Sequence, residues 1–180
     1  MAKILSKIVD KVIFPAASLV VGKVVGMYIA IQSFGYDWHV KNYTPDSSFF
    51  TVRFVFDTPE AALNVNTFSN MFMFGLVFLI SVFVVMLAVF LHASHQNPRV
   101  ISQLAKLNLL GLIRNTQDIL TDAMTWFTAL WISSLIIIYS TFIGSSFLWI
   151  APVSFVLSLI LSAILISDLD KELTPRAKLQ

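Results

Sequence analysis

The chain has 180 residues, a formal net charge of +2, and a composition that is 57% hydrophobic and only 12% charged. A soluble globular domain is about half apolar and about a quarter charged, so this composition excludes that class and indicates a lipid-facing surface. Cysteine is absent, which excludes disulfides, thiolate metal sites and thiol redox chemistry. The basic residues do not form an aromatic-lined patch, so no nucleic-acid partner is expected.

Four stretches are apolar enough to cross a bilayer as helices, which takes about 20 mostly apolar residues each. They cover approximately residues 12–34, 68–91, 119–143 and 147–167. Only Gly144, Ser145 and Ser146 separate the last two stretches, so we expect a tight helical hairpin there. The sequence therefore predicts a single all-α, polytopic membrane domain over residues 1–180, with four transmembrane helices and a small extracytoplasmic loop.

Lysine and arginine are distributed unevenly between the two sides of this arrangement. Only Lys41 and Arg53 lie in the loop on one side. The opposite side carries Lys3, Lys7, Lys11, Arg99, Lys106, Arg114, Lys171, Arg176 and Lys178. Because cytoplasmic segments are enriched in these residues, both chain ends are expected in the cytoplasm. The first helix has basic residues ahead of it and no cleavage site, so we expect a retained helix in a plasma membrane, by default the bacterial inner membrane.

The outer loop, at residues 35–66, is predicted to hold a short strand followed by a short helix. Residues 48–56 alternate in a way typical of a strand, and one face of that strand carries Phe50, Val52, Phe54 and Phe56. Asp57 and Glu60 are spaced as in a capping box, which predicts a helix start and a short helix through Leu63. A lone strand leaves backbone groups unpaired, so we interpret this one as a docking strand that pairs with a partner elsewhere.

A second segment outside the predicted spans, at residues 98–114 on the cytoplasmic side, has apolar residues near helical spacing. Asn97 and Pro98 precede it as a cap and a first-turn proline would. This pattern predicts an amphipathic helix. Two interpretations stay open: the helix lies in the membrane interface, or it packs against the protein's own bundle.

Lys23 is the candidate intramembrane charge, because it lies near the centre of the first apolar stretch. Snorkelling to the headgroups or a structural pairing is the favoured interpretation, and a transport or gating role is the alternative. The predicted spans contain no carboxylate except Asp122, near the cytoplasmic start of the third, so a proton- or sodium-coupled pump is not expected. We expect the partner of Lys23 to be a carboxylate of another subunit or a lipid phosphate.

Two predicted spans carry small residues at every fourth position, and this spacing favours close helix packing in membranes. The first stripe is Ser18, Gly22, Gly26 and Ala30, and the second, in the fourth span, is Ser154, Ser158 and Ser162. These stripes are predicted helix-packing interfaces. They serve either association with another chain or packing within this one.

No pattern of a catalytic, cofactor or metal site is recognisable. His92 and His95 are one helical turn apart, but two imidazoles without further ligands do not complete a metal site. The sequence therefore favours a non-catalytic structural or assembly subunit of a larger integral-membrane complex of the secretion, conjugation or respiratory type. Its expected partners are the lipid bilayer and other membrane subunits, or further copies of itself.

Two alternative functions stay open. The first is a homo-oligomeric channel or pore with Lys23 near the path. The second is a membrane-embedded enzyme acting on a lipid or quinone, for which Asp118, Asp122, His92 and His95 are the available polar residues on the cytoplasmic side.

Overall fold

The computed structural model describes residues 2–42, 52–95 and 116–177, and these form four long helices. The helices are α1 (Ala2–Phe34), α2 (Pro59–His95), α4 (Thr116–Phe142) and α5 (Ile150–Ala177). Each contains a stretch that is long and apolar enough to cross a membrane. The structure thus confirms the prediction of four such helices, as in a multi-pass membrane protein. The predicted amphipathic helix at 98–114 lies outside the described residues.

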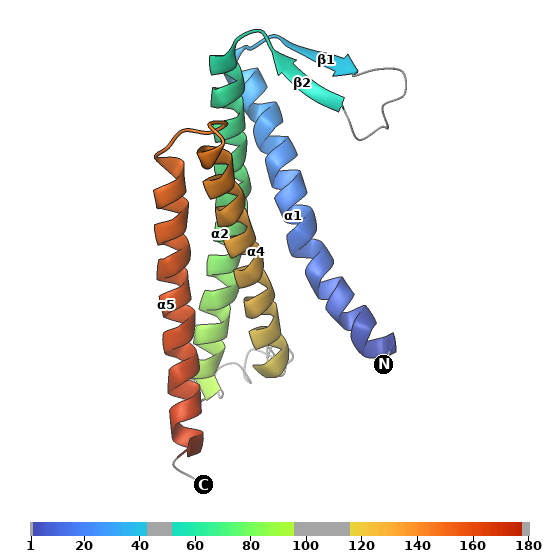
Figure 1. The fold of residues 1–180 in the computed structure, drawn as a ribbon. Helices are drawn as coiled ribbons and strands as arrows, with labels where there is room; N and C mark the ends of the chain where they lie inside the picture. The colour runs from blue at the N-terminus through green and yellow to red at the C-terminus, as the bar shows by residue number, and fades with distance from the viewer. Residues whose placement is uncertain (1, 43–51, 96–115, 178–180) are drawn as a thin grey trace.

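The four helices run side by side, with α2 in contact with each of the other three. Helices α1 and α5 lie on opposite sides of the α2–α4 pair (Figure 1). Both chain termini lie at one end of the molecule, while the turn between α4 and α5 lies toward the other end. At that second end α1 and α2 extend beyond the turn and carry two short strands.

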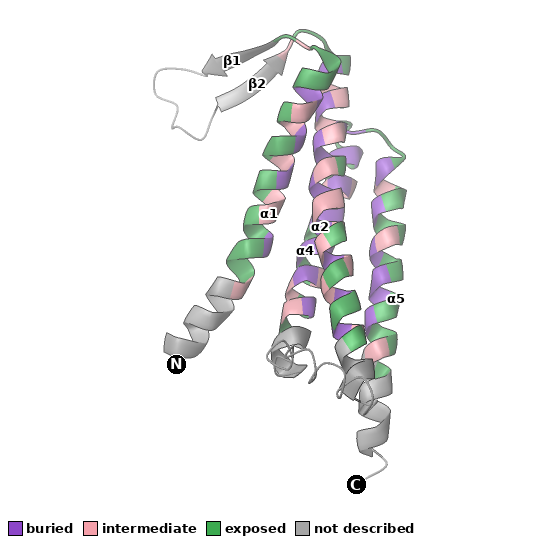
Figure 2. Ribbon diagram, turned by 180° about the vertical axis from the view of Figure 1, so that it is seen from behind, coloured by how far each residue is buried: buried purple, intermediate pink, exposed green. Residues whose placement is uncertain are grey.

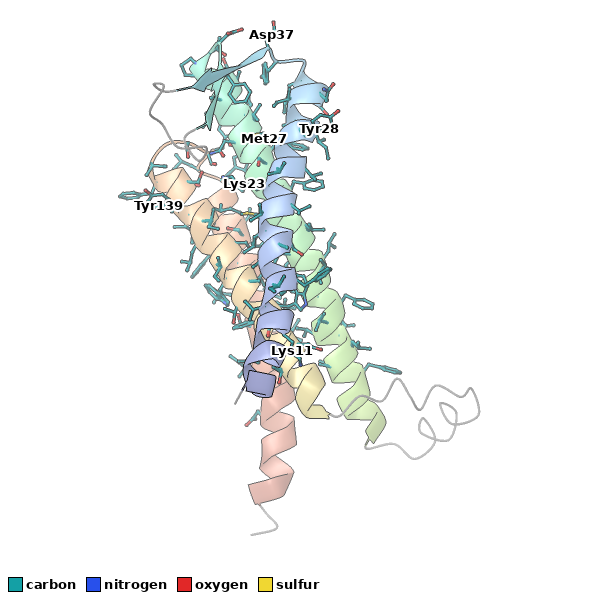
Figure 3. The ribbon with its side chains drawn as sticks, turned by 90° about the vertical axis from the view of Figure 1, so that its right-hand side faces the viewer. Lys11, Lys23, Met27, Tyr28, Asp37 and Tyr139 are labelled. Carbon is teal, nitrogen blue, oxygen red and sulfur yellow. The ribbon has the colours of Figure 1, made fainter. Side chains whose placement is uncertain are left out.

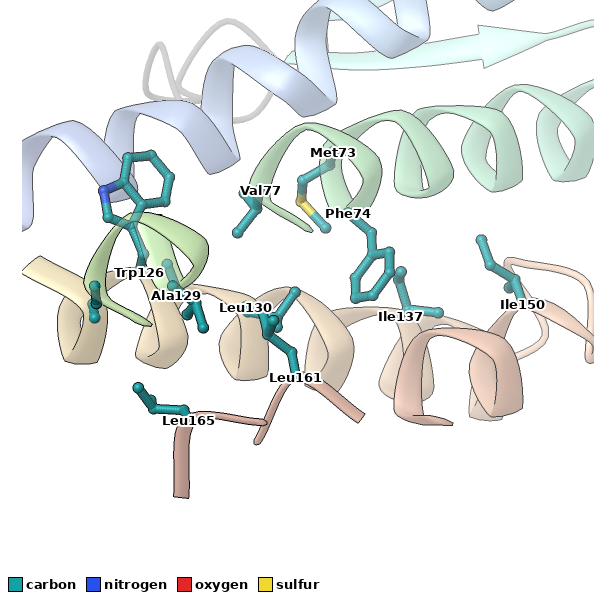
Figure 4. Close-up of a cluster of buried hydrophobic side chains, with 13 residues drawn as sticks. Met73, Phe74, Val77, Trp126, Ala129, Leu130, Ile137, Ile150, Leu161 and Leu165 are labelled. Atoms are coloured by element: carbon teal, nitrogen blue, oxygen red, sulfur yellow. The ribbon is translucent and has the colours of Figure 1, made fainter. Parts of the chain in front are cut away.

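The hydrophobic core lies where α2, α4 and α5 meet. It consists of side chains that are at least 93% buried (Figure 4): Met73, Phe74, Val77, Val85, Ala88, Ala123, Trp126, Ala129, Leu130, Ile137, Ile150, Leu161 and Leu165. The outward faces of all four helices are exposed and largely apolar (Figure 2). Such a surface is stable in lipid and would aggregate in water.

The outer loop differs from the sequence prediction in how its strand is paired. Strand β2 (Val52–Phe56) pairs antiparallel with β1 (Trp38–Asn42), and Trp38 lies opposite Phe56. The backbone partner of β2 therefore comes from the same loop, whereas we had expected it elsewhere. Of the four residues predicted on the docking face, Phe50 lies outside the described residues, and Phe56 is half-buried at the top of α2.

Helix α2 begins at Pro59 and runs without a break, so the sequence prediction of a separate short helix through Leu63 does not hold. The helix starts where the spacing of Asp57 and Glu60 predicted, and the hydroxyl of Thr58, one residue after Asp57, accepts a hydrogen bond from the Ala61 backbone N–H at 3.1 Å. The predicted span began only near residue 68, because the preceding asparagines lower the local hydropathy. Their amides instead form hydrogen bonds within the chain.

Candidate functional site

Lys23 is held inside the chain by two asparagines of the neighbouring helix. Its Nζ donates a hydrogen bond to Asn66 Oδ1 at 3.2 Å and another to Asn70 Oδ1. The two asparagines are four residues apart on α2, so their side chains lie on the same face of the helix. Hydrogen bonds from a charged group contribute about 1.5–3 kcal/mol each, roughly twice the value of neutral ones. This pairing fixes α1 against α2.

The amide nitrogens of the same asparagines reach a cluster of serines on the other side. Asn70 Nδ2 donates to Ser140 Oγ at 2.9 Å and to Ser146 Oγ at 2.8 Å. Asn66 Nδ2 donates to the backbone oxygen of Ser145 at 2.6 Å. Asn70 is completely buried. The network therefore runs from α1 through α2 to the end of α4, and each asparagine uses both ends of its amide.

The serines converge because the end of α4 folds into a Schellman motif. The Ser145 N–H bonds back to the Ser140 carbonyl at 2.9 Å, and the Gly144 N–H bonds to the Thr141 carbonyl at 3.0 Å. Gly144 adopts a φ of 73°, which a glycine reaches without steric cost. This turn brings the hydroxyls of Ser145 and Ser146 within hydrogen-bond distance of the Ser140 hydroxyl.

Close backbone contact between α1 and α2 brings Lys23 to its partners. A Cβ added to Gly26 would lie 2.6 Å from Phe72 Cβ, and one added to Gly22 would lie 3.0 Å from the Met73 Cα. Next to these contacts, Ser69 Oγ donates to the Lys23 carbonyl at 2.6 Å. The two glycines of this stripe therefore face α2 of the same chain.

The other two members of the first stripe differ in burial: Ala30 lies in the contact between α1 and α2, and Ser18 lies partly outside it. Ala30 is completely buried next to Val65 of α2, whereas Ser18 is only half-buried. The Ser18 hydroxyl donates to the Phe14 carbonyl of its own helix at 2.9 Å. Only part of the stripe thus lies in the contact with α2.

The second stripe, on α5, packs against α4. Ser154, Ser158 and Ser162 are each at least 93% buried. Trp131 Nε1 donates to Ser162 Oγ at 3.2 Å, and Ser134 Oγ donates to Ser154 Oγ at 3.4 Å. The small side chains let the helices approach, and the hydroxyls of Ser154 and Ser162 accept hydrogen bonds from α4.

A pocket of about 500 Å³ opens beside Lys23 on the side of the hairpin. Four parts of the chain line it: α1, α2, the end of β2 and the α4–α5 turn. Figure 3 shows Lys23 at the level of this turn, below Met27 and Tyr28 on the same helix. Most of the lining is apolar, and Lys23, Asn66 and Ser145 are the polar side chains nearest the network.

The comparisons give no relative for this chain. No protein-family model, characterised protein or solved structure matches it.

A second, smaller hollow of about 270 Å³ separates α1 from α4 in the half of the molecule nearer the termini. Lys11 and Asp122 bridge the two helices at its end, with 2.9 Å between Nζ and Oδ1. The rings of Phe14 and Trp126 meet edge to face, with centroids 5.9 Å apart. These contacts hold α1 to α4 where the two helices diverge.

Sequence reasoning missed Asn66 and Asn70, which are the centre of the site. A signal for them was present, because asparagines four residues apart in an otherwise apolar helix mark a polar face that needs partners. The prediction that Lys23 would find its partner outside the chain rested on a search for carboxylates alone. The neutral amide oxygens of α2 are equally able to accept its hydrogen bonds.

Proposed function

We propose that the chain is a non-catalytic structural or assembly subunit of a larger integral-membrane complex, and that it binds a transmembrane helix of another subunit through α1. The observation that carries the proposal is the exposed apolar face of α1, which runs from Val20, before Lys23, to Tyr28, beyond the level of the α4–α5 turn. Eleven residues of helix follow Lys23, from Val24 to Phe34, which is about 17 Å.

The face in question is formed by side chains on the side of α1 opposite its glycines. Val20 is 65% exposed, Val24 55% and Tyr28 63%. Of the apolar stretch of α1 only 17% is buried within the chain, against 33% for α2, 44% for α4 and 33% for α5. Helix α1 therefore has the smallest buried share of the four, and it also extends past the ends of α4 and α5. Lipid alone therefore covers α1 less completely than it covers α4 or α5.

This function accounts for Lys23 better than a pore does. A basic ring around a pore would need the ammonium group on the outward face of α1, whereas Lys23 Nζ is bonded to Asn66 and Asn70 of its own chain. For the enzyme alternative, Asp122 forms an ion pair with Lys11. The side chains of Asp118, His92 and His95 lie outside the described part of the structure.

We further propose a bacterial inner-membrane location with both ends in the cytoplasm. The excess of lysine and arginine near the termini supports this orientation, and so does the position of both termini at one end of the molecule (Figure 1). Because the chain has no cysteine, labelling of single-cysteine variants tests this orientation without a signal from native thiols of the chain. An impermeant maleimide added to intact cells should label Asp37→Cys and leave Lys3→Cys unlabelled, and the reverse pattern would refute the orientation.

Photocrosslinking in the native membrane tests the proposed function. A photoreactive residue at Val24 or Tyr28 should give an adduct with one distinct membrane protein. The control is Leu135, which is 58% exposed on α4, and there we expect lipid adducts only. Lipid adducts at all three positions would refute the proposal. Adducts with a second copy of the chain would instead favour the homo-oligomeric pore.

A further inference from the structure

The ammonium group of Lys23 carries a charge that no anion neutralises within the described part of the chain. An ammonium group has three N–H donors. Two of them reach Asn66 Oδ1 and Asn70 Oδ1, which are both neutral. Among the residues that the structure describes, no carboxylate and no third acceptor contacts the group. Because a partly buried charge is unfavourable without a counter-charge, this site favours an anion.

The pocket beside Lys23 is polar at its inner end and apolar at its outer end. Lys23, Asn66 and Ser145 line it at the level of the α4–α5 turn. Met27 follows Lys23 by about one helical turn on α1, and Leu63 precedes Asn66 by almost one turn on α2. Both therefore line the pocket farther from the end of the molecule that holds the termini (Figure 3). A ligand that fits this lining has its charge at the inner end.

The apolar part of the pocket lies beyond the hydrocarbon core of a bilayer. The apolar stretches of α4 and α5 have 22 and 19 residues, which correspond to about 33 and 29 Å and so match a core of about 30 Å. The turn that joins them therefore lies at the edge of the core, where the half-exposed Trp149 is typical of an interfacial residue. A phospholipid with its phosphate on Lys23 would direct its acyl chains toward water, so a lipid headgroup does not fit this pocket.

The pocket is adjacent to the exposed face of α1. Residues at positions i, i+3, i+4 and i+7 form one continuous face of a helix, and here they are Val20, Lys23, Val24 and Met27. The two valines are more than half exposed, whereas Lys23 and Met27 are half-buried. A helix that covers the two valines therefore passes beside the pocket, and one of its side chains can reach Lys23.

We propose that the subunit bound to α1 inserts an aspartate or glutamate side chain into this pocket, where its carboxylate accepts the third N–H of Lys23. An apolar side chain about one turn farther out on the same partner helix packs against Met27 and Leu63. The carboxylate neutralises the charge that Asn66 and Asn70 leave uncompensated, and both asparagines keep their hydrogen bonds. This inference rests on the proposed function, and it names the chemistry by which the partner is recognised.

Carbodiimide crosslinking in the native membrane tests the contact directly. A membrane-permeant carbodiimide activates carboxylates, and an amine in contact with an activated carboxylate forms an amide. The wild type should give a peptide in which Lys23 is joined to an aspartate or glutamate of a different membrane protein. The internal positive control is the intrachain link between Lys11 and Asp122, which are 2.9 Å apart. A Lys23 that stays unlinked while this control forms would overturn the proposal, and so would its linkage to a lipid, to a second copy or to its own chain.

Four variants separate the charge from the packing. Lys23→Arg keeps the positive charge and cannot form the amide, so the partner should be retained while the crosslink is lost. Lys23→Met should lower the amount of co-purified partner at least about tenfold, as expected for the loss of a charge-assisted hydrogen bond. Lys11→Gln removes a charge of α1 outside this pocket and should retain the partner. If Lys23→Met does not fold, Ala62→Trp fills the pocket instead and should also lower co-purification. Wild-type recovery of the partner with Lys23→Met or Ala62→Trp would overturn the proposal.

The photocrosslink at Val24 distinguishes failure of this inference from failure of the proposed function. If Val24 forms an adduct with another membrane protein while Lys23 forms no amide with it, the pocket contact is refuted and the subunit function stands. If Val24 forms only lipid adducts, both are refuted. Replacement of the crosslinked carboxylate by its amide should weaken binding to the wild type and cause no further loss with Lys23→Met, whereas independent losses would contradict the pair.

Discussion

Substitution of Gly26 by alanine should force α1 away from α2. The added Cβ would lie 2.6 Å from Phe72 Cβ and 3.0 Å from the Ser69 Cα, whereas carbon atoms in contact are about 3.5–4.0 Å apart. Phe72 Cβ and Ser69 Cα cannot rotate away, because both are fixed to the α2 backbone. Overpacking of this kind costs about 1–3 kcal/mol. Loss of the hydrogen bond from Ser69 to the Lys23 carbonyl adds about 0.6 kcal/mol.

The matched control is Gly75→Ala, since a Cβ at Gly75 meets nothing within 4 Å. Alanine is the better helix former by up to about 1 kcal/mol, so this variant should be as stable as the wild type or slightly more stable. Gly22→Ala should fall between the two, because its closest contact is 3.0 Å. The free energy of unfolding would be measured by SDS titration in mixed micelles, followed by tryptophan fluorescence. Equal stability of the Gly26 and Gly75 variants would refute the close α1–α2 contact.

Three further substitutions probe the polar contacts. Asn70→Leu should lower the free energy of unfolding by about 2–4 kcal/mol, because it removes one charged and two neutral hydrogen bonds. The control Ser81→Ala removes one hydrogen bond to a backbone carbonyl and should lower it by only about 0.6 kcal/mol. Equal losses for the two variants would contradict the network. A double-mutant cycle of Lys11→Gln and Asp122→Asn should give a coupling of about 0.5–1 kcal/mol that falls as salt is added, and zero coupling at low salt would contradict their ion pair. Gly144→Ala should cost about 1–2 kcal/mol in the same titration, because a φ of 73° is unfavourable for a residue with a Cβ; an unchanged stability would argue against the Schellman turn.

The four helices could be predicted because hydropathy over about 20 residues is a strong and local signal. The start of α2 could be predicted only in part. The spacing of Asp57 and Glu60 predicted a helix start there, but it did not single out the Thr58 cap. The polar residues between this start and the apolar stretch led to a prediction of two helices where the structure has one. The pairing of β2 with β1 depends on how the loop folds back on itself, which the alternation within β2 alone does not specify.

The position of the candidate site could be predicted from the sequence, but its hydrogen-bond network could not. Lys23 stands out in the sequence because a charge in an apolar helix is costly. Its partners could not be found by searching for opposite charges, since Asn66 and Asn70 are neutral. The serines of the α4–α5 turn come together through a backbone motif at Gly144 and become partners only when three helices are packed.

The central claim, that the chain is a subunit of a larger membrane assembly, is tested most directly by gentle detergent extraction from the native membrane followed by native mass spectrometry. The account predicts co-purification with at least one different membrane protein in a fixed ratio, and loss of that partner when Val24 and Tyr28 on the exposed face of α1 are replaced by bulkier residues. A chain that is extracted only as a monomer or as a homo-oligomer would contradict the claim.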